Sequence, residues 1–302
     1  MKKFLNKFPA WGWAGLGLIL IFWPLNWLGP EGITRWGFFP LWLGYCLTVD
    51  GLVYLRKGSS LASRSWSKYA VLFLLSVPLW WTFEALNLRL ENWQYLGRET
   101  FSDLEYALLA SLSFSTVIPA VLGSAELIGS LEVLRPLKNL WVFQPGRKAE
   151  LLVFAAGWVS LGAVLAWPRY FYPLVWLAVY FILEPVNRWL GFPTLVDWTE
   201  RGDWRPFGAL FLGVLLTGFF WEMWNYFSFP KWVYSVPFVG FWKIFEMPLL
   251  GYGGYLPFSL EIYAFTRLAF GLLGWDLQSY YPLVKDSRDS ARASSRASRS
   301  EA

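Results

Sequence analysis

Long apolar runs alternate with short polar stretches along most of this chain. Most runs approach the length of a helix that crosses the hydrocarbon core of a bilayer, about 20 residues. A further apolar stretch, 236–252, is interrupted by Pro237 and Pro248, so we expect a re-entrant or interfacial segment there. The pattern predicts eight spans, roughly at residues 10–29, 36–55, 69–88, 105–130, 150–167, 169–187, 207–228 and 256–274. The expected fold is therefore an all-α, multi-pass membrane protein.

Basic residues gather in alternate loops between these spans. Three lysines precede the first span, and two later loops, after the second and fourth spans, are rich in lysine and arginine. Positively charged loops stay on the cytoplasmic side, so we expect a cytoplasmic-membrane protein with both termini in the cytoplasm. The residues that carry this expectation are Lys2, Lys3, Lys7, Arg56, Lys57, Arg64, Lys68, Arg135, Lys138, Arg147 and Lys148.

Composition agrees with a membrane location and excludes several kinds of chemistry. The chain has 22 tryptophans in 302 residues and no histidine. Histidine-ligated haem or di-iron centres and Ser-His-Asp catalysis therefore cannot be built. Cys46 is the single cysteine, so no intrachain disulfide forms. Nucleotide-binding glycine motifs and aspartate-rich clusters for Mg²⁺ are missing, so we expect no cofactor, no metal site and no nucleic-acid partner.

Two segments of the chain resemble each other. FEALNLRLENWQY at 83–95 and WEMWNYFSFPKWVY at 221–234 both read aromatic-Glu-x-x-Asn, followed by Trp-x-Tyr. Acidic residues elsewhere match in the same order and at similar offsets. The matched pairs are Asp50 and Glu184, Glu84 and Glu222, Asn87 and Asn225, Trp93 and Trp232, Tyr95 and Tyr234, and Glu105 and Glu246.

This repeat predicts that the chain arose by duplication of a four-span unit. The expected halves are 1–130 and 150–285, joined by a cytoplasmic linker at 131–149. Four spans is an even number, so the two halves insert in the same orientation as parallel repeats. The remaining residues, 286–302, are Ser/Arg/Ala-rich, and we expect them to be disordered.

The repeated polar residues are the candidates for chemistry. A glutamate and an asparagine three residues apart lie on one helix face, and buried acids in spans are functional by default. We predict that one glutamate donates a proton near a shared centre and that its twin accepts one. The predicted catalytic residues are Glu84, Glu222, Asn87, Asn225 and Glu246. The predicted substrate-binding residues are Trp93, Tyr95, Trp232, Tyr234, Trp221 and Glu261.

A structural explanation of these residues stays open. Glutamate and asparagine in membrane helices often hydrogen-bond to neighbouring helices, and tryptophan and tyrosine often mark the membrane interface. Glu246 and Glu261 fit either explanation. The sequence alone does not separate helix tethering from catalysis.

A family resemblance points in the same direction as the buried acids. It is carried by Trp221-Glu222, Trp232-Val233-Tyr234 and Phe245-Glu246-Met247-Pro248-Leu249. These stretches, with weaker copies in the first half, resemble the lycopene cyclase domain of bacterial heterodimeric and fungal carotenoid cyclases. The resemblance implies a helical membrane enzyme whose acidic residues protonate a polyene and trigger ring closure.

We therefore expect a membrane enzyme that acts on an apolar isoprenoid or another lipid by carboxylate acid–base chemistry. Two alternatives stay open at this point. One is a non-enzymatic membrane protein that binds a pigment, quinone, lipid or partner subunit. The other is a proton-coupled transporter that uses its carboxylates as a relay.

Overall fold

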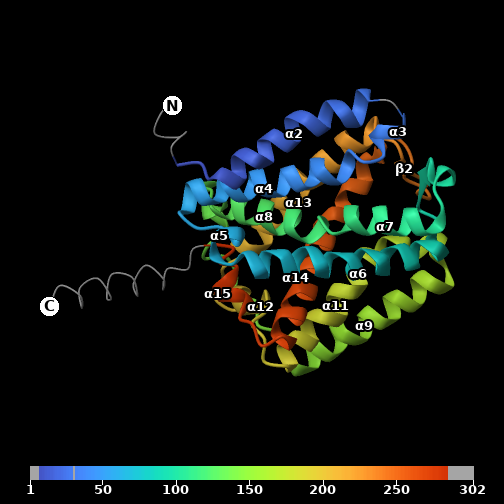
Figure 1. The fold of residues 1–302 in the computed structure, drawn as a ribbon. Coiled ribbons are helices and arrows are strands. Elements are labelled where there is room, and N and C mark those ends of the chain that lie inside the picture. The colour runs from blue at the N-terminus through green and yellow to red at the C-terminus, as the bar shows by residue number, and fades with distance from the viewer. Residues whose placement is uncertain (1–6, 30, 285–302) are drawn as a thin grey trace.

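The computed structural model describes residues 7–29 and 31–284, and the described part is mostly helical (Figure 1). The tail expected at 286–302 lies outside the described residues. Six helical segments in the described part are long and apolar enough to cross a membrane, which supports the multi-pass class. They are α2 (Ala10–Leu28), α4 (Phe38–Lys57), α6 (Trp66–Leu90), α7 with α8 (Asp103–Phe114 and Val117–Gly129), α9 (Arg147–Ala166) and α13 (Arg205–Tyr226).

The predicted spans at 169–187 and 256–274 are also helical, but neither is both long enough and apolar enough to count as a span. Helix α11 has 15 residues, which is short for a span of about 20. The polar residues of α14, Glu261 and Arg267 among them, lower its mean hydropathy. These parts of the chain form α10 (Pro168–Phe171), the 3-10 turn η3 (Tyr172–Leu174), α11 (Val175–Trp189) and α14 (Tyr252–Leu272).

Short helices connect these long ones. They are α3 (Glu31–Thr34), α5 (Leu61–Arg64), η1 (Arg98–Thr100), η2 (Glu132–Leu137), α12 (Val196–Thr199), η4 (Leu249–Gly251) and α15 (Leu277–Tyr280). Helices α5, α12 and α15 lie at the end of the bundle where α2 begins, on the left in Figure 1. The segment 131–149 contains η2 and is anchored to the second half, because the Leu140 amide donates to the Gly202 carbonyl at 2.8 Å.

The expectation of a purely helical fold is wrong in one respect. Strand β1 (Trp93–Leu96) pairs antiparallel with β2 (Lys231–Tyr234), and together they form a ribbon that joins the two halves of the chain. The apolar stretch 236–252 contributes a second ladder, β3 (Lys243–Ile244) with β4 (Met247–Pro248). Strands this short carry almost no periodic signal, and the partner of β1 lies far away in the sequence, so the sequence pattern did not reveal them.

The two halves present the same order of elements. Helices α2, α4, α5 and α6, strand β1 and helices α7 and α8 correspond in order to α9, α11, α12 and α13, strand β2 and helix α14. The packing corresponds as well, because α2 packs on α4 as α9 packs on α11, and α4 packs on α8 as α11 packs on α14. Helix α8 also packs tightly on α13, which connects the halves inside the bundle.

Close helix contacts depend on small residues. A Cβ atom on Gly15 of α2 would lie 2.7 Å from the Gly44 carbonyl oxygen of α4, and one on Gly213 of α13 would lie 2.5 Å from the Ala125 backbone of α8. Small residues let helix backbones approach each other closely, which is a common way to pack helices in membranes. These positions therefore explain why α2 packs on α4 and α8 on α13.

Equivalent acids cap equivalent short helices. The Ala62 amide donates to Asp50 Oδ1 at 3.0 Å, and the Leu195 amide donates to Glu184 Oε1 at 2.8 Å. Each carboxylate thus satisfies a backbone N–H at the start of α5 or α12, where a helix has free donors and a positive dipole end. Asp50 and Glu184 are therefore capping residues.

A buried charge cluster holds the same end of the bundle together. Glu126 of α8 is fully buried, and it pairs with Lys57 at 2.6 Å and Arg64 at 2.6 Å. A carboxylate is costly to bury unless it is paired and hydrogen-bonded. Glu126 therefore ties α8 to the C-terminal end of α4 and to α5.

We predict that Glu126→Ala destabilises the fold strongly. Removing the carboxylate takes the paired negative charge away from two partly buried cations, which costs about 3–5 kcal/mol. Denaturant unfolding of the detergent-solubilised protein measures the change in the free energy of unfolding. Glu132→Ala, which changes an exposed acid on η2, is the matched control and should change the free energy of unfolding by less than about 0.5 kcal/mol. Equal stability of the two variants contradicts the role given to Glu126.

The register of the ribbon predicts that two engineered cysteines, one in each strand, can form a disulfide. Gln94 of β1 and Val233 of β2 stand directly opposite each other in the register. With Cys46→Ala as background, the pair Gln94→Cys and Val233→Cys should form a disulfide on mild oxidation, detected as a mobility shift that reductant reverses. Gln94→Cys with Lys148→Cys, on a different element, is the control that should stay uncoupled. Equal coupling of both pairs rules out the register.

Candidate functional site

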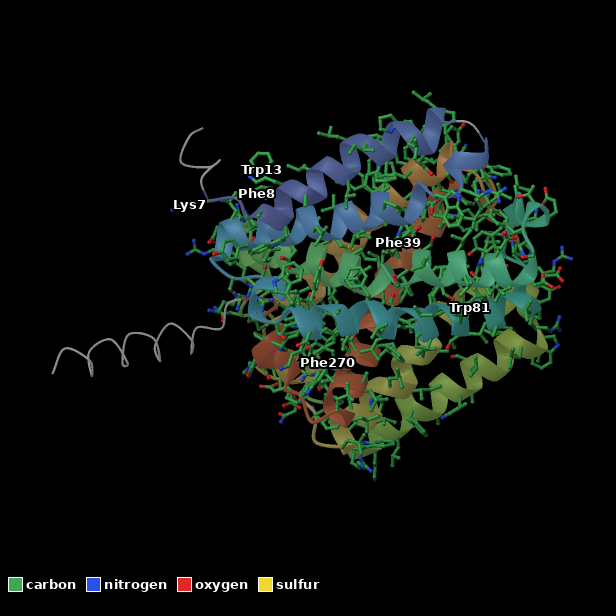
Figure 2. The ribbon with its side chains drawn as sticks, viewed as in Figure 1. Lys7, Phe8, Trp13, Phe39, Trp81 and Phe270 are labelled. Carbon is green, nitrogen blue, oxygen red and sulfur yellow. The ribbon has the colours of Figure 1, made fainter. Side chains whose placement is uncertain are left out.

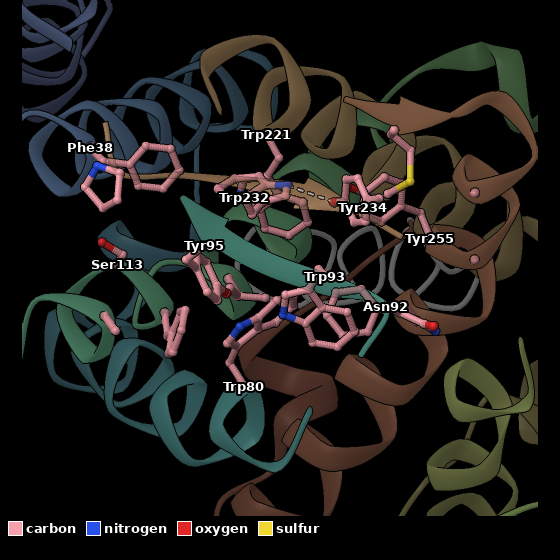
Figure 3. A pocket seen from close by; sticks show the side chains of 18 of the residues that line it. Phe38, Trp80, Asn92, Trp93, Tyr95, Ser113, Trp221, Trp232, Tyr234 and Tyr255 are labelled. Carbon is pink, nitrogen blue, oxygen red and sulfur yellow. Dashed lines mark hydrogen bonds between the residues drawn. The ribbon is translucent and has the colours of Figure 1, made fainter. Parts of the chain in front are cut away.

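A partly open cavity of about 190 Å³ lies beneath the β1–β2 ribbon, and aromatic side chains make most of its wall (Figure 3). Both halves of the chain contribute, because the strands that close the cavity come one from each half. The aromatic residues of the wall include Trp80, Trp93, Tyr95, Tyr106, Tyr172, Trp176, Trp221, Trp232, Tyr234, Tyr255 and Phe258. One shared cavity is thus built from the motifs of both repeats.

The register of the ribbon explains how four predicted residues reach this cavity. Trp93 stands opposite Tyr234, and Tyr95 stands opposite Trp232. Alternate residues of a strand point to the same face, and all four of these side chains line the cavity. The intervening Gln94 is exposed on the other face. The aromatic Trp-x-Tyr spacing is therefore the signature of a strand with one face on a cavity.

Glu84 lies behind this wall and organises one side of it. Its Oε1 atom accepts hydrogen bonds from Trp80 Nε1 at 2.9 Å, Trp93 Nε1 at 3.1 Å and the Tyr95 hydroxyl at 2.6 Å. These three donors line the cavity, whereas Glu84 itself does not. The carboxylate therefore acts on the cavity through the aromatic residues that it holds.

Glu222 has the equivalent place on the other side, with a different set of partners. Its Oε1 atom accepts from the hydroxyls of Tyr234 at 2.7 Å and Tyr255 at 2.6 Å, and Trp232 Nε1 donates to the Tyr234 hydroxyl at 2.8 Å. Glu222 is fully buried, and its Oε2 atom has no hydrogen-bond partner. Three donors converge on Glu84 and two on Glu222, so the two environments differ.

The strand tyrosines stay protonated at neutral pH. Burial and the neighbouring Glu84 carboxylate hold the pKa of Tyr95 well above its ordinary value. Burial and the Glu222 carboxylate do the same for the pKa of Tyr234. Both hydroxyls are therefore hydrogen-bond donors to a glutamate and present a polar oxygen at the cavity wall.

The two predicted asparagines hold the backbone at the start of each strand of the ribbon. Asn87 donates to the Trp93 carbonyl at 2.7 Å and accepts from the Asn92 amide at 2.9 Å. Asn225 donates to the Trp232 carbonyl at 2.7 Å and accepts from the Trp232 amide at 2.9 Å. Both amides bond to backbone groups and neither lines the cavity, so they position the ribbon; a part in catalysis stays a prediction.

The remaining predicted residues divide between the cavity and its surroundings. Trp221 lines the cavity, with its ring 5.9 Å from the ring of Tyr255. Glu246 sits between β3 and β4 and pairs with Lys231, outside the cavity wall. Glu261 accepts a hydrogen bond from the Val179 amide at 3.2 Å, so it connects α14 to α11 and does not touch the cavity.

Two donors to the carboxylates escaped prediction from the sequence. Trp80 lies one helical turn before Glu84, so i,i+4 spacing on α6 could have revealed it. Tyr255 lies on α14, and only the packing of α14 on α13 brings it to Glu222. No local pattern in the sequence connects Tyr255 with Glu222.

Comparison of the chain with protein-family models, curated proteins and solved structures gave no match. Within the described residues, no group of three or more cysteine, aspartate and glutamate side chains is arranged to hold a metal ion. The chemistry of the site is therefore interpreted from its aromatic wall and its two carboxylates.

We predict that Asn225→Ala loosens the ribbon. The substitution leaves the Trp232 backbone without two hydrogen bonds, and unpaired buried polar groups cost about 1–3 kcal/mol. The free energy of unfolding in detergent should fall by that amount. Gln94→Ala, on the exposed face of the same ribbon, should change it by less than about 0.5 kcal/mol. If Asn225→Ala is as stable as the unsubstituted protein, the positioning role is wrong.

Proposed function

We propose that this chain is an integral membrane enzyme that isomerises an unsaturated isoprenoid or related lipid by proton transfer. One observation carries the proposal: two glutamate–tyrosine pairs, Glu84 with Tyr95 and Glu222 with Tyr234, meet at one aromatic cavity. Their positions correspond in the two halves, yet their hydrogen-bond environments differ. A site with two matched acids in unlike environments suits chemistry that adds a proton at one place and removes it at another.

The proposed architecture is a pair of parallel four-helix repeats with eight spans in the cytoplasmic membrane. The shared order of elements and the equivalent caps at Asp50 and Glu184 support the duplication. Helix α5 lies at the end of the bundle where α2 begins (Figure 1), and it carries Arg64 and follows Lys57, the last residue of α4; these basic residues support cytoplasmic termini. In this orientation the aromatic cavity lies near the extracytoplasmic surface.

The geometry suggests which pair is the acid. A negative charge on Glu222 is costly, because its Oε2 atom is buried without a donor. In the proposed step the hydroxyl of Tyr234 or Tyr255 turns and gives its own proton to the substrate alkene, while its oxygen takes the proton of a neutral Glu222. Glu84 receives three donors on one oxygen, an arrangement that stabilises a carboxylate. Glu84 is therefore assigned as the base, acting through Tyr95.

The proposed reaction balances as an isomerisation. A proton adds to one carbon of the alkene, and the adjacent carbon becomes a cation that the faces of Trp93 and Trp232 stabilise. Loss of a proton from a neighbouring carbon to the Tyr95–Glu84 pair restores a double bond. Substrate and product have the same atoms. Glu84 then releases its proton to solvent and Glu222 takes one from solvent, which completes the cycle.

The size of the cavity limits what reacts there. A dry apolar cavity of about 150 Å³ holds one benzene molecule. The cavity here, about 190 Å³, therefore fits a single ring or a short branched chain. A long isoprenoid would place only its reacting end beneath the ribbon, and the rest would lie outside.

A non-enzymatic binding protein is the second candidate. The observation that favours it is that neither Glu84 nor Glu222 lines the cavity, so a ligand meets aromatic rings and hydroxyls first. A quinone or pigment ring would stack on such a wall. A proton-coupled transporter remains a third alternative, and it rests only on the buried carboxylates.

Solvent deuterium tests the enzymatic proposal. The purified protein is incubated in D₂O with the isoprenoid lipid extract of its expression host, and the lipids are analysed by mass spectrometry. We expect one lipid to gain a single deuterium and to change retention time. Glu222→Gln and Glu84→Gln should each slow this exchange by about 10²- to 10⁴-fold, because general acid–base groups contribute that much.

Glu246→Gln is the matched control, since Glu246 lies at the same end of the bundle but outside the cavity wall. Its exchange rate should stay within a few-fold of the unsubstituted protein. Full exchange in both Glu84→Gln and Glu222→Gln would exclude the acid–base mechanism. A tightly bound ring compound that co-purifies with every variant and never exchanges would favour the binding protein.

A further inference from the structure

A second cavity adjoins the aromatic one. Its volume is about 320 Å³, and it lies among α2, α4 and α7. It shares Arg35, Leu109 and Ser113 with the aromatic cavity, so these residues stand where the two meet. Its other wall residues include Phe22, Phe39 (labelled in Figure 2), Pro40 and Leu112. We call it the outer cavity.

The outer cavity reaches the apolar surface of the bundle. Leu112 lines it and is 46% exposed, and Leu108, one turn earlier on α7, is 59% exposed. Helices α7 and α8 together are long and apolar enough to cross a membrane. Exposed leucines on such a helix face lipid. The outer cavity therefore connects the lipid-facing surface of α7 with the aromatic cavity.

Arg35 is the single charged residue among the described residues that line either cavity. Its guanidinium carbon lies 4.6 Å from the centre of the Phe101 ring, and its Nε atom is buried without a hydrogen-bond partner. No carboxylate of the described residues lies within 4.0 Å of it. An arginine that served only the interface would extend towards lipid headgroups. Arg35 lines both cavities instead, and it is half-buried.

The acids near this end of the bundle already have partners. Asp103 pairs with Arg98, and Glu246 pairs with Lys231. Glu105 accepts hydrogen bonds from the amide and hydroxyl of Ser102 at 3.0 and 2.8 Å, as the cap of α7. The charge of Arg35 also attracts the exposed Glu105 carboxylate, but the two do not form an ion pair. Arg35 therefore has no ion-pair partner among the described residues.

We propose that Arg35 binds the anionic group of an amphiphilic ligand at the junction of the two cavities. The inference rests on the proposed function and narrows its substrate class to an unsaturated lipid with one phosphate or carboxylate. The ligand enters from the bilayer through the outer cavity, and its anionic group stops at Arg35. Its unsaturated segment then fills the aromatic cavity.

The chemistry of arginine favours this assignment. A guanidinium forms two parallel hydrogen bonds with a phosphate or carboxylate, and its hold is stronger where water is scarce. The ring of Phe101 fixes the plane of the guanidinium, so less freedom is lost when an anion binds. Ser113 adds a hydroxyl at the same junction.

Binding of farnesyl monophosphate, measured against neutral farnesol, tests the proposal. The full-length protein in neutral detergent should bind farnesyl monophosphate about 10- to 100-fold more tightly than farnesol, because hydrogen bonds to charged groups contribute that much. Arg35→Gln should remove this preference, and Arg35→Lys should retain part of it. Arg169→Gln is the control, because Arg169 also lies beside a phenylalanine ring but lines neither cavity.

Binding of two further lipids, oleate and phosphatidylglycerol, identifies the source of the anion. Oleate that competes with farnesyl monophosphate supports a site for any single-chain anion. Phosphatidylglycerol that binds while both single-chain probes fail assigns the site to a membrane lipid and overturns the substrate class. Equal binding of farnesol and farnesyl monophosphate, or a preference that survives Arg35→Gln, overturns the proposal outright.

The two proposals fail separately. Glu222→Gln should bind farnesyl monophosphate as the unsubstituted protein does, while deuterium exchange into lipid stops. If Arg35→Gln abolishes the preference for the phosphate but Glu222→Gln still exchanges at the full rate, the anion site stands and the acid–base mechanism falls. If exchange depends on Glu222 but the protein shows no preference for the phosphate, the acid–base mechanism stands and the anion site falls.

Discussion

The cost of burying a carboxylate is the constraint on which this structure depends. An acid inside an apolar bundle must receive donors or cations, since charge without a partner is expensive there. Glu126 receives two cations, and Glu184 receives the N–H of a helix start. Glu84 and Glu222 receive aromatic N–H and O–H groups. These ion pairs and hydrogen bonds join elements that are separate in the sequence, so the buried acids also help to determine which helices pack together.

The aromatic donors link this constraint to the site. An indole or phenol can satisfy a buried carboxylate with one end and present an apolar face to a cavity with the other. Trp93 and Tyr95 do this for Glu84, and Tyr234 does it for Glu222. The cavity wall is therefore apolar to a ligand, although acids stand directly behind it. This arrangement supports proton transfer at a surface that binds a hydrocarbon.

Much of the helical framework was predictable, because about 20 consecutive apolar residues have few alternatives to a membrane span. The ribbon and the role of the asparagines were not predictable. Asn87 and Asn225 sit three residues after a glutamate, which suggested a shared catalytic face. In the structure each amide turns to the backbone of the strand that follows, because that strand leaves a donor and an acceptor to satisfy.

The sequence by itself determined the class of protein, the repeated Glu-x-x-Asn and Trp-x-Tyr motifs, and five of the aromatic residues that line the cavity. These features depend on local composition and spacing. Only the tertiary structure decided that β1 pairs with β2, that Tyr255 reaches Glu222 and that Arg35 stands between two cavities. Those contacts join residues 33 to 141 positions apart in the chain, which helix packing and strand register bring together.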